Sequence, residues 1–227
     1  MKKLLFITVL AMIIACAEAP KKPKPPTNGY FYEYKDDKVD TLNFKRYLYK
    51  NGIVVQEMLF VDGKVNGEAK EYYLDGKLRS TIEYKDAKRN GMFVMYYETG
   101  EKYSETPYEN GKEQGISQFY KKDGAVTAKV KYETGVPVPP LEEFDSEGKP
   151  IQQPKIKFRT SGGSLKMELD DKSFKATQFY TMEKNGKLVK IPTAKGEGVL
   201  VSFQSGTKVR AVYTSKRGRE GAVDARY

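Results

Sequence analysis

Four aromatic side chains recur at a spacing of 24 residues and are the strongest candidates for ligand contact: Tyr72, Tyr96, Tyr120 and Phe144. Aromatic faces stack on sugars, peptides and arginine side chains, so a row of them suits a binding surface. Cross-strand packing is the competing interpretation, because it stabilises most tyrosine-rich sheets. The chain has no Trp, which disfavours a glycan as the ligand.

Basic residues near the C-terminus form a second candidate site, made of Lys208, Arg210, Lys216, Arg217 and Arg219. Residues 151–227 hold 16 basic and 7 acidic residues, which accounts for most of the net charge of +10. Such a patch fits an anionic polymer such as lipopolysaccharide or teichoic acid, or membrane phosphates. A solvated basic face without a ligand is the alternative. Nucleic acid matches the charge, but the export signal described below disfavours it.

The residue types argue against catalysis. The chain contains no His and one Cys, so it lacks an imidazole base, a His-bearing zinc site and an intrachain disulfide. The adjacent carboxylates at 36–37, 142–143 and 170–171 point to opposite faces if they lie on strands. We expect no catalytic residue, no metal and no cofactor. A glycan hydrolase accessory that uses two distant carboxylates is the enzymatic alternative.

The N-terminus predicts export and a lipid anchor. Residues 1–15 combine two lysines with a short apolar stretch, as in a secretory signal peptide. The end of this stretch, Ile13-Ile14-Ala15-Cys16, resembles the lipobox of bacterial lipoproteins, which implies a mature protein that begins at an acylated Cys16 and is held at a membrane. A plain cleaved signal is the alternative. Residues 16–29 are rich in Pro and Lys and predict an extended tether.

The element that positions the aromatic row is a repeat of 24 residues. A fixed period in this range is typical of stacked repeat proteins. Each repeat predicts a loop, a strand, a two-residue turn of type I′ and a returning strand, which together give an antiparallel meander. Three further columns share the period: the turn glycines Gly52, Gly76, Gly100, Gly124 and Gly148; the aromatic residues Phe60, Tyr84, Tyr108 and Tyr132; and the loop glycines Gly67, Gly91 and Gly115.

Strand alternation predicts which side chains share a face. One face is expected to be apolar, and the aromatic row lies on the opposite face. A register slip of one residue would exchange the two faces. The predicted apolar face comprises Ala69, Tyr73, Leu78, Ile82, Tyr84, Phe93, Met95, Tyr97, Phe119, Val126, Ala128, Val130 and Tyr132.

The spacing G-x(4)-Y-x(3)-G-x(7)-Y, as in Gly67, Tyr72, Gly76 and Tyr84, resembles the MORN-variant repeats of bacterial proteins, including YwqK-like antitoxins. The resemblance covers about residues 44–150 and implies a twisted single-layer sheet that presents a surface to partners, without enzyme activity. The unit at 38–61 matches less well, because Asn43 and Leu48 stand where the loop Gly and the Tyr are expected. The run Val-Pro-Val-Pro-Pro at 136–140 replaces the last loop; since Pro does not pair within a sheet, it predicts a frayed, capping end.

Residues 151–227 leave the repeat and predict a small, basic β-sandwich after the repeat sheet at 30–150. The last two expected strands resemble those of fibronectin type III or immunoglobulin-like modules, without the Cys and Trp pattern of true immunoglobulin domains. The expected strands are 156–160, 165–169, 176–183, 188–192, 198–204, 209–215 and 222–227.

The sequence as a whole predicts an all-β, non-catalytic protein of the bacterial cell envelope, anchored to a membrane through Cys16. Its repeat sheet would serve as an interaction scaffold for an unidentified envelope protein or anionic polymer. An antitoxin or immunity-type protein that captures a secreted effector is the main alternative.

Overall fold

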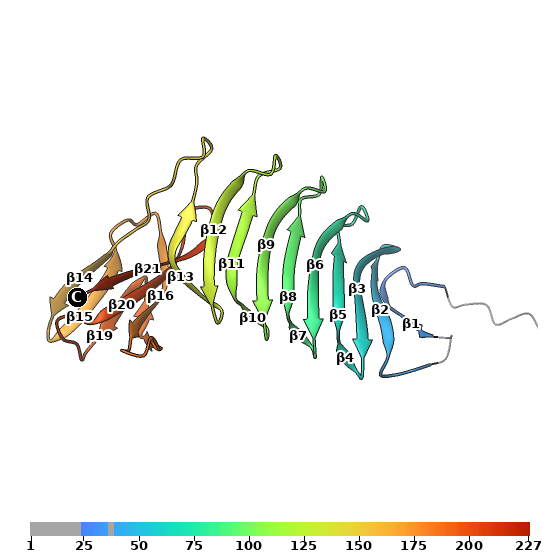
Figure 1. The fold of residues 1–227 in the computed structure, drawn as a ribbon, viewed down its shortest axis with the longest axis horizontal. Helices are drawn as coiled ribbons and strands as arrows, with labels where there is room; N and C mark the ends of the chain where they lie inside the picture. The colour runs from blue at the N-terminus through green and yellow to red at the C-terminus, as the bar shows by residue number, and fades with distance from the viewer. Residues whose placement is uncertain (1–23, 36–38) are drawn as a thin grey trace, which may run out of the picture.

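The computed structural model describes residues 24–35 and 39–227, and Cys16 with its signal segment lies outside this part of the chain. The fold is all-β, as predicted, with a long meander followed by two smaller sheets (Figure 1). Among the described residues, none belongs to a helix long and apolar enough to cross a membrane.

The meander is one antiparallel sheet in the order β1-β2-β3-β5-β6-β8-β9-β11-β12-β13, and the short strands β4, β7 and β10 extend its hairpins. Consecutive strands are neighbours throughout, as the 24-residue period requires. The bounds are β1 Gly29–Tyr34, β2 Phe44–Lys50, β3 Ile53–Val61, β4 Lys64–Val65, β5 Gly67–Tyr72, β6 Leu78–Lys85, β7 Lys88–Arg89, β8 Gly91–Tyr96, β9 Lys102–Glu109, β10 Lys112–Glu113, β11 Gly115–Tyr120, β12 Val126–Glu133 and β13 Val136–Glu143.

The turns within the repeats and the loops between them both differ from the prediction in backbone conformation. Asn51-Gly52 has two positive φ values, as a type I′ turn requires, but at the later turn glycines only the glycine has a positive φ. Those turns are longer, and Asp75 stabilises one of them by accepting the backbone N–H of Lys77. The pairs with two positive φ values lie instead in the loops between repeats, at Asp62-Gly63, Asp86-Ala87, Asn110-Gly111 and Thr134-Gly135.

A β-bulge beside each of the turns at Gly76, Gly100 and Gly124 exchanges the two faces locally. Residues directly opposite each other share a face, and Leu78 lies opposite Tyr72 whereas Ile82 lies opposite Ala69. The predicted positions of Leu78 and Val126 are therefore wrong, because the extra residue of the bulge reverses the alternation. The positions of Ala69 and Ile82 on one face, with the tyrosine row on the other, are confirmed.

The first repeat also carries an aromatic residue in the row. Tyr49 lies opposite Val54 in the same way that Tyr72 lies opposite Leu78. The expected position, Leu48, was wrong by one residue because the turn at Asn51-Gly52 is shorter than the later turns.

The proline-rich run does not fray. It forms β13, and Pro137 lies opposite Tyr132 at the edge of the sheet. Pro is tolerated on an edge strand, where its missing N–H faces away from the neighbouring strand. A bulge between Lys129 and Lys131 accommodates the run, which contains a cis bond between Pro139 and Pro140.

The C-terminal part consists of two four-stranded sheets, in the orders β14-β15-β19-β18 and β17-β16-β20-β21. Eight strands are present where seven were expected, because residues 193–200 form two short strands. The bounds are β14 Ile156–Ser161, β15 Ser164–Leu169, β16 Lys175–Met182, β17 Leu188–Ile191, β18 Thr193–Ala194, β19 Glu197–Leu200, β20 Lys208–Thr214 and β21 Glu220–Arg226.

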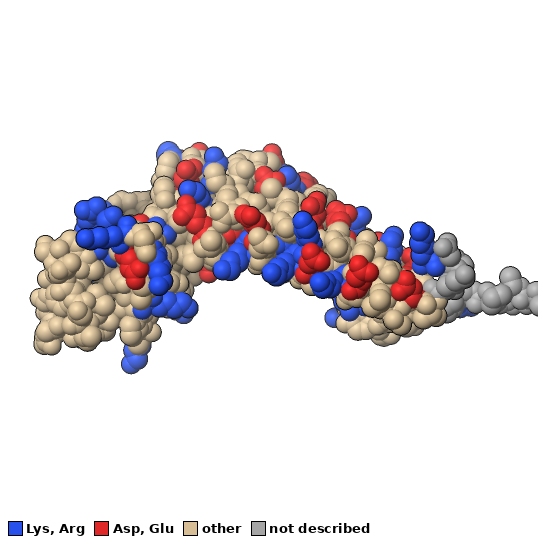
Figure 2. All heavy atoms as spheres, turned by 60° about the horizontal axis from the view of Figure 1, so that its bottom comes forward, with Lys and Arg blue, Asp and Glu red and all other residues tan. Residues whose placement is uncertain are grey.

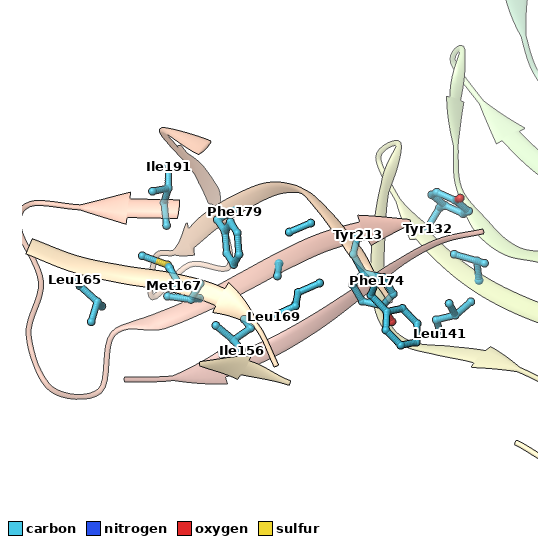
Figure 3. Packing of buried hydrophobic residues seen from close by; sticks show 14 of the residues in the cluster. Tyr132, Leu141, Ile156, Leu165, Met167, Leu169, Phe174, Phe179, Ile191 and Tyr213 are labelled. Carbon is cyan, nitrogen blue, oxygen red and sulfur yellow. The ribbon is translucent and has the colours of Figure 1, made fainter. Parts of the chain in front are cut away.

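One hydrophobic core joins the repeat sheet to the C-terminal sheets (Figure 3). Tyr132 and Leu141 come from the last repeat strands, whereas Phe174 directly precedes β16 and Tyr213 lies in β20. Gly221 brings β21 so close to β13 that a Cβ there would lie 2.9 Å from Leu141. Shared burial of these side chains fixes the two parts against each other.

Candidate functional site

The face of the repeat sheet that carries Tyr72, Tyr96 and Tyr120, here called the Tyr face, is the main candidate site. The three rings end the strands β5, β8 and β11 and are half-buried. Every second strand contributes one ring, so neighbouring rings are about 10 Å apart. Phe144 follows β13, two residues after Glu142, which lies opposite Lys129 on this face.

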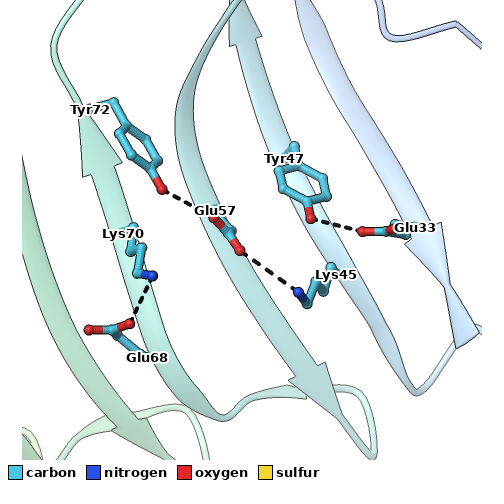
Figure 4. Close-up of polar contacts among 7 residues, drawn as sticks. All are labelled: Glu33, Lys45, Tyr47, Glu57, Glu68, Lys70 and Tyr72. Carbon is cyan, nitrogen blue, oxygen red and sulfur yellow. Dashed lines mark hydrogen bonds and ion pairs between the residues drawn. The ribbon is translucent and has the colours of Figure 1, made fainter. Parts of the chain in front are cut away.

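Tyr72 is held by a carboxylate on the neighbouring strand. Its hydroxyl donates a hydrogen bond of 3.2 Å to Glu57, which lies 4.0 Å from Lys45 (Figure 4). Burial and the negative charge of Glu57 raise the pKa of Tyr72. Lys70 and Glu68 form a further pair at 3.1 Å on the same face. The hydrogen bond to Glu57 holds the Tyr72 ring in place, and the half-buried ring stays partly accessible to solvent.

Tyr120 repeats this arrangement two units later. Its hydroxyl donates to Glu105, which also forms an ion pair with Lys102 at 2.7 Å. The Lys102 ammonium lies 5.7 Å from the centre of the Tyr120 ring. Burial and the bond to Glu105 raise the pKa of Tyr120 to about 12. Hydrogen bonds from Lys102 and Tyr120 lower the pKa of Glu105.

Tyr96 differs from its neighbours in the row. The position that corresponds to Glu57 and Glu105 is Thr81, whose side chain is too short to act as their carboxylates do. Among the described residues, the Tyr96 hydroxyl makes no hydrogen bond. Of Tyr72, Tyr96 and Tyr120, Tyr96 is therefore the one whose polar end remains available to a ligand.

Tyr73 and Tyr97 form hydrogen bonds between repeats that the sequence did not predict. Tyr73 donates from its hydroxyl to the carbonyl oxygen of Tyr96 at 2.6 Å, and Tyr97 donates to that of Tyr120 at 2.7 Å. Each bond spans 23 residues and joins one repeat to the next. The 24-residue spacing of Tyr73 and Tyr97 was the available signal, but it carried no information about which acceptor they meet.

Two of the predicted basic residues join the two parts of the protein. The Arg219 guanidinium lies 4.0 Å from the centre of the Phe119 ring and donates to the Tyr103 hydroxyl at 2.7 Å. Arg217 donates to the carbonyl oxygen of Phe144. These contacts occupy both side chains at the joint, where a cation over an aromatic ring contributes about 1 kcal/mol.

Of the other predicted basic residues, one is paired within the chain and two are exposed to solvent. Arg210 forms a bidentate pair with Asp224, at 2.7 and 2.9 Å. Lys208 and Lys216 are exposed. In the space-filling view, basic side chains gather at the end of the molecule formed by the C-terminal sheets, while acidic and basic residues alternate along the arched repeat sheet (Figure 2). The structure therefore does not unite the five residues into one cationic site.

A groove lies elsewhere on the C-terminal sheets, near the start of β16. It has a volume of about 960 Å³, and its rim carries Lys172, Lys175 and Lys195 together with Glu168 and Glu197. Opposite charges on one rim give it little preference for an anion. In the described part of the chain, no cluster of three acidic or Cys side chains is placed to hold a metal ion.

An open, repeat-built sheet with an aromatic row on one face defines a repeat-based binding scaffold. The family model described as a MORN repeat variant matches residues 65–86 and 89–110. The chain thus carries two MORN-variant repeats, which together span the strands from β4 to β9. No curated protein sequence matches the chain.

Proposed function

We propose that this chain is a non-catalytic, lipid-anchored scaffold of the bacterial cell envelope, and that its Tyr face holds an envelope protein or polymer. The observation that carries the proposal is the alignment of Tyr72, Tyr96 and Tyr120 on one partly exposed face. Repeat proteins use such extended surfaces to hold partners, because each unit adds one equivalent position.

Two sequence features support the anchor and the lack of catalysis. The only Cys follows a signal-like segment at position 16, where an acyl chain would hold the protein at a membrane. The absence of His removes the side chain most used for proton transfer at neutral pH. Release of fragments from purified cell-wall polymer by the mature protein would contradict the non-catalytic part.

The binding surface is tested by capture of partners from envelope extracts. Tyr96→Ala should reduce capture strongly with little loss of stability, because the Tyr96 hydroxyl has no partner among the described residues. Tyr30→Ala is the matched control, since Tyr30 is 53% exposed on the opposite face. Equal capture by wild type and Tyr96→Ala would remove the tyrosine row as the contact surface.

The anchor is tested separately in the native host. Labelled palmitate should be incorporated into the wild-type chain and not into Cys16→Ala, which should leave the membrane fraction. A Cys16→Ala protein that stays membrane-bound would contradict the lipid anchor without affecting the argument for the Tyr face.

A further inference from the structure

One row of side chains across the Tyr face changes from acidic to apolar to basic. Glu68 lies opposite Glu83, Met92 lies opposite Pro107, and Ile116 lies opposite Lys131. The registers of β6 with β8 and of β9 with β11 place Met92 beside Glu83, and Ile116 beside Pro107. These six residues, here called the cross-strand row, span β5 to β12. With strands about 4.8 Å apart, the row is about 24 Å long.

The centre of the cross-strand row is an exposed apolar patch. Met92 is 42% exposed and Ile116 is 53% exposed. The residue 24 positions before Met92 is Glu68, and the residue 24 positions after Pro107 is Lys131. From β5 to β12 these positions therefore carry charges at both ends and apolar side chains in the middle, whereas one repeat earlier the residue that corresponds to Glu83 is the exposed Leu59. Exposed apolar side chains with a polar rim are typical of protein interaction sites.

The acidic end of the cross-strand row has an excess of negative charge. Like charges directly opposite each other destabilise a sheet, and Glu68 faces Glu83. Lys70 pairs with Glu68, whereas among the described residues Glu83 forms no ion pair. A basic side chain from a partner would relieve this repulsion. At the other end, Lys131 pairs with Glu133 in an exposed pair, which contributes little and exchanges readily for a partner's carboxylate.

We propose that the cross-strand row docks a protein segment with a basic end, an apolar centre and an acidic end. This inference rests on the proposed function and selects a protein among its possible ligands. A segment of about 16 helical residues spans the 24 Å of the row. An anionic polymer fits less well, because it would lie over two glutamates and an apolar centre.

The probe is a synthetic helical peptide of about 16 residues, with lysines at one end, leucines in the centre and glutamates at the other end. Ile116→Asp should weaken its binding about tenfold or more, as measured by fluorescence anisotropy. Leu74→Asp is the matched control and should bind like wild type, because Leu74 is 55% exposed in a turn outside the row.

A charge exchange tests the orientation. Glu83→Lys should weaken binding of the first peptide and strengthen binding of a second peptide whose lysines are replaced by glutamates. Equal affinity of all variants, or no binding of the first peptide at about 1 mM, would overturn the proposal. Polyphosphate binding without peptide binding would identify an anionic polymer as the occupant and would also overturn it.

Failure here is distinguishable from failure of the proposed function. If Tyr96→Ala abolishes capture from envelope extracts while Ile116→Asp does not, the Tyr face remains the binding surface and the cross-strand row is not its centre. If neither variant changes capture, both proposals fail.

Discussion

Replacing Ala87 by Gly should stabilise the repeat sheet, although it removes a side-chain atom. Ala87 has a φ of 63°, and the equivalent turn positions in the neighbouring loops are Gly63, Gly111 and Gly135. A residue with a Cβ costs about 1–2 kcal/mol in this left-handed conformation. Gly in turn loses about 0.5–1 kcal/mol more conformational entropy on folding. Because Ala87 is exposed, no buried contact is lost, and the net gain is about 0.5–1 kcal/mol.

The backbone at this turn links two repeats, so the gain should be visible in global unfolding. The Ala87 N–H donates to the carbonyl oxygen of Val65 at 2.9 Å, as the Gly111 N–H donates to that of Arg89. A gain of this size raises the melting temperature of a chain of this length by about 1–4 °C. Thermal and urea unfolding followed by circular dichroism would measure it.

The reverse substitution provides the control. Gly111→Ala places a Cβ in an open position, with the nearest atom 4.0 Å away, at a φ of 86°. It should therefore destabilise the protein by about the same amount through backbone strain alone. A loss of stability in Ala87→Gly, or no change in either variant, would show that these loops do not hold the left-handed conformation and would refute the reasoning.

Three further substitutions test the joint, the hydrogen bonds of Glu105 and the C-terminal core. Arg219→Ala should cost about 1–3 kcal/mol by removing its ring contact and hydrogen bond, and should increase proteolysis between the repeat and C-terminal sheets; exposed Lys216→Ala should do neither. Because hydrogen bonds lower the pKa of Glu105, its contribution to stability is present above its ordinary pKa and is lost as pH falls through the lowered value. Acid titration of unfolding should therefore show a weaker pH dependence in Glu105→Gln, and an unchanged dependence would contradict this assignment. Gly198→Ala should cost about 1–3 kcal/mol, because its Cβ would lie 2.8 Å from a buried phenylalanine ring; wild-type urea stability would be inconsistent with that packing.

The 24-residue period was sufficient to predict the meander and the common face of the tyrosine row, because both depend only on regular repetition. It was not sufficient for the turns. An Asp-Gly pair fits a type I′ turn in isolation, but Asp75 serves a longer turn through its carboxylate. Ala87, which no turn statistic favours at positive φ, occupies a tight one. Pairing of the flanking strands overrides the local preference in both cases.

The basic residues show a different limit of composition. Charge counts located the excess of Lys and Arg in residues 151–227 correctly, but they cannot state which of these side chains meet a partner within the chain. Arg219 meets Tyr103, which is 116 positions away. Such a contact depends on how the C-terminal sheets pack against β13, and that packing is set by buried residues such as Leu141 rather than by charge.

The cross-strand row could not be recognised in the sequence, because its members do not follow a single fixed spacing. Its members are separated by 15 and 9 residues in alternation, from Glu68 to Glu83 and then to Met92. The two spacings add up to the 24-residue period, but the length of each one depends on the turn lengths and on the bulges at the strand ends. A sequence comparison along the 24-residue columns therefore finds tyrosines in line, whereas the acidic, apolar and basic zones emerge only after the register of every hairpin is known. A partner that docks on the sheet contacts side chains of neighbouring strands, which come from different repeats. We therefore expect the residues that differ between repeats, rather than those that recur every 24 residues, to determine what this sheet binds.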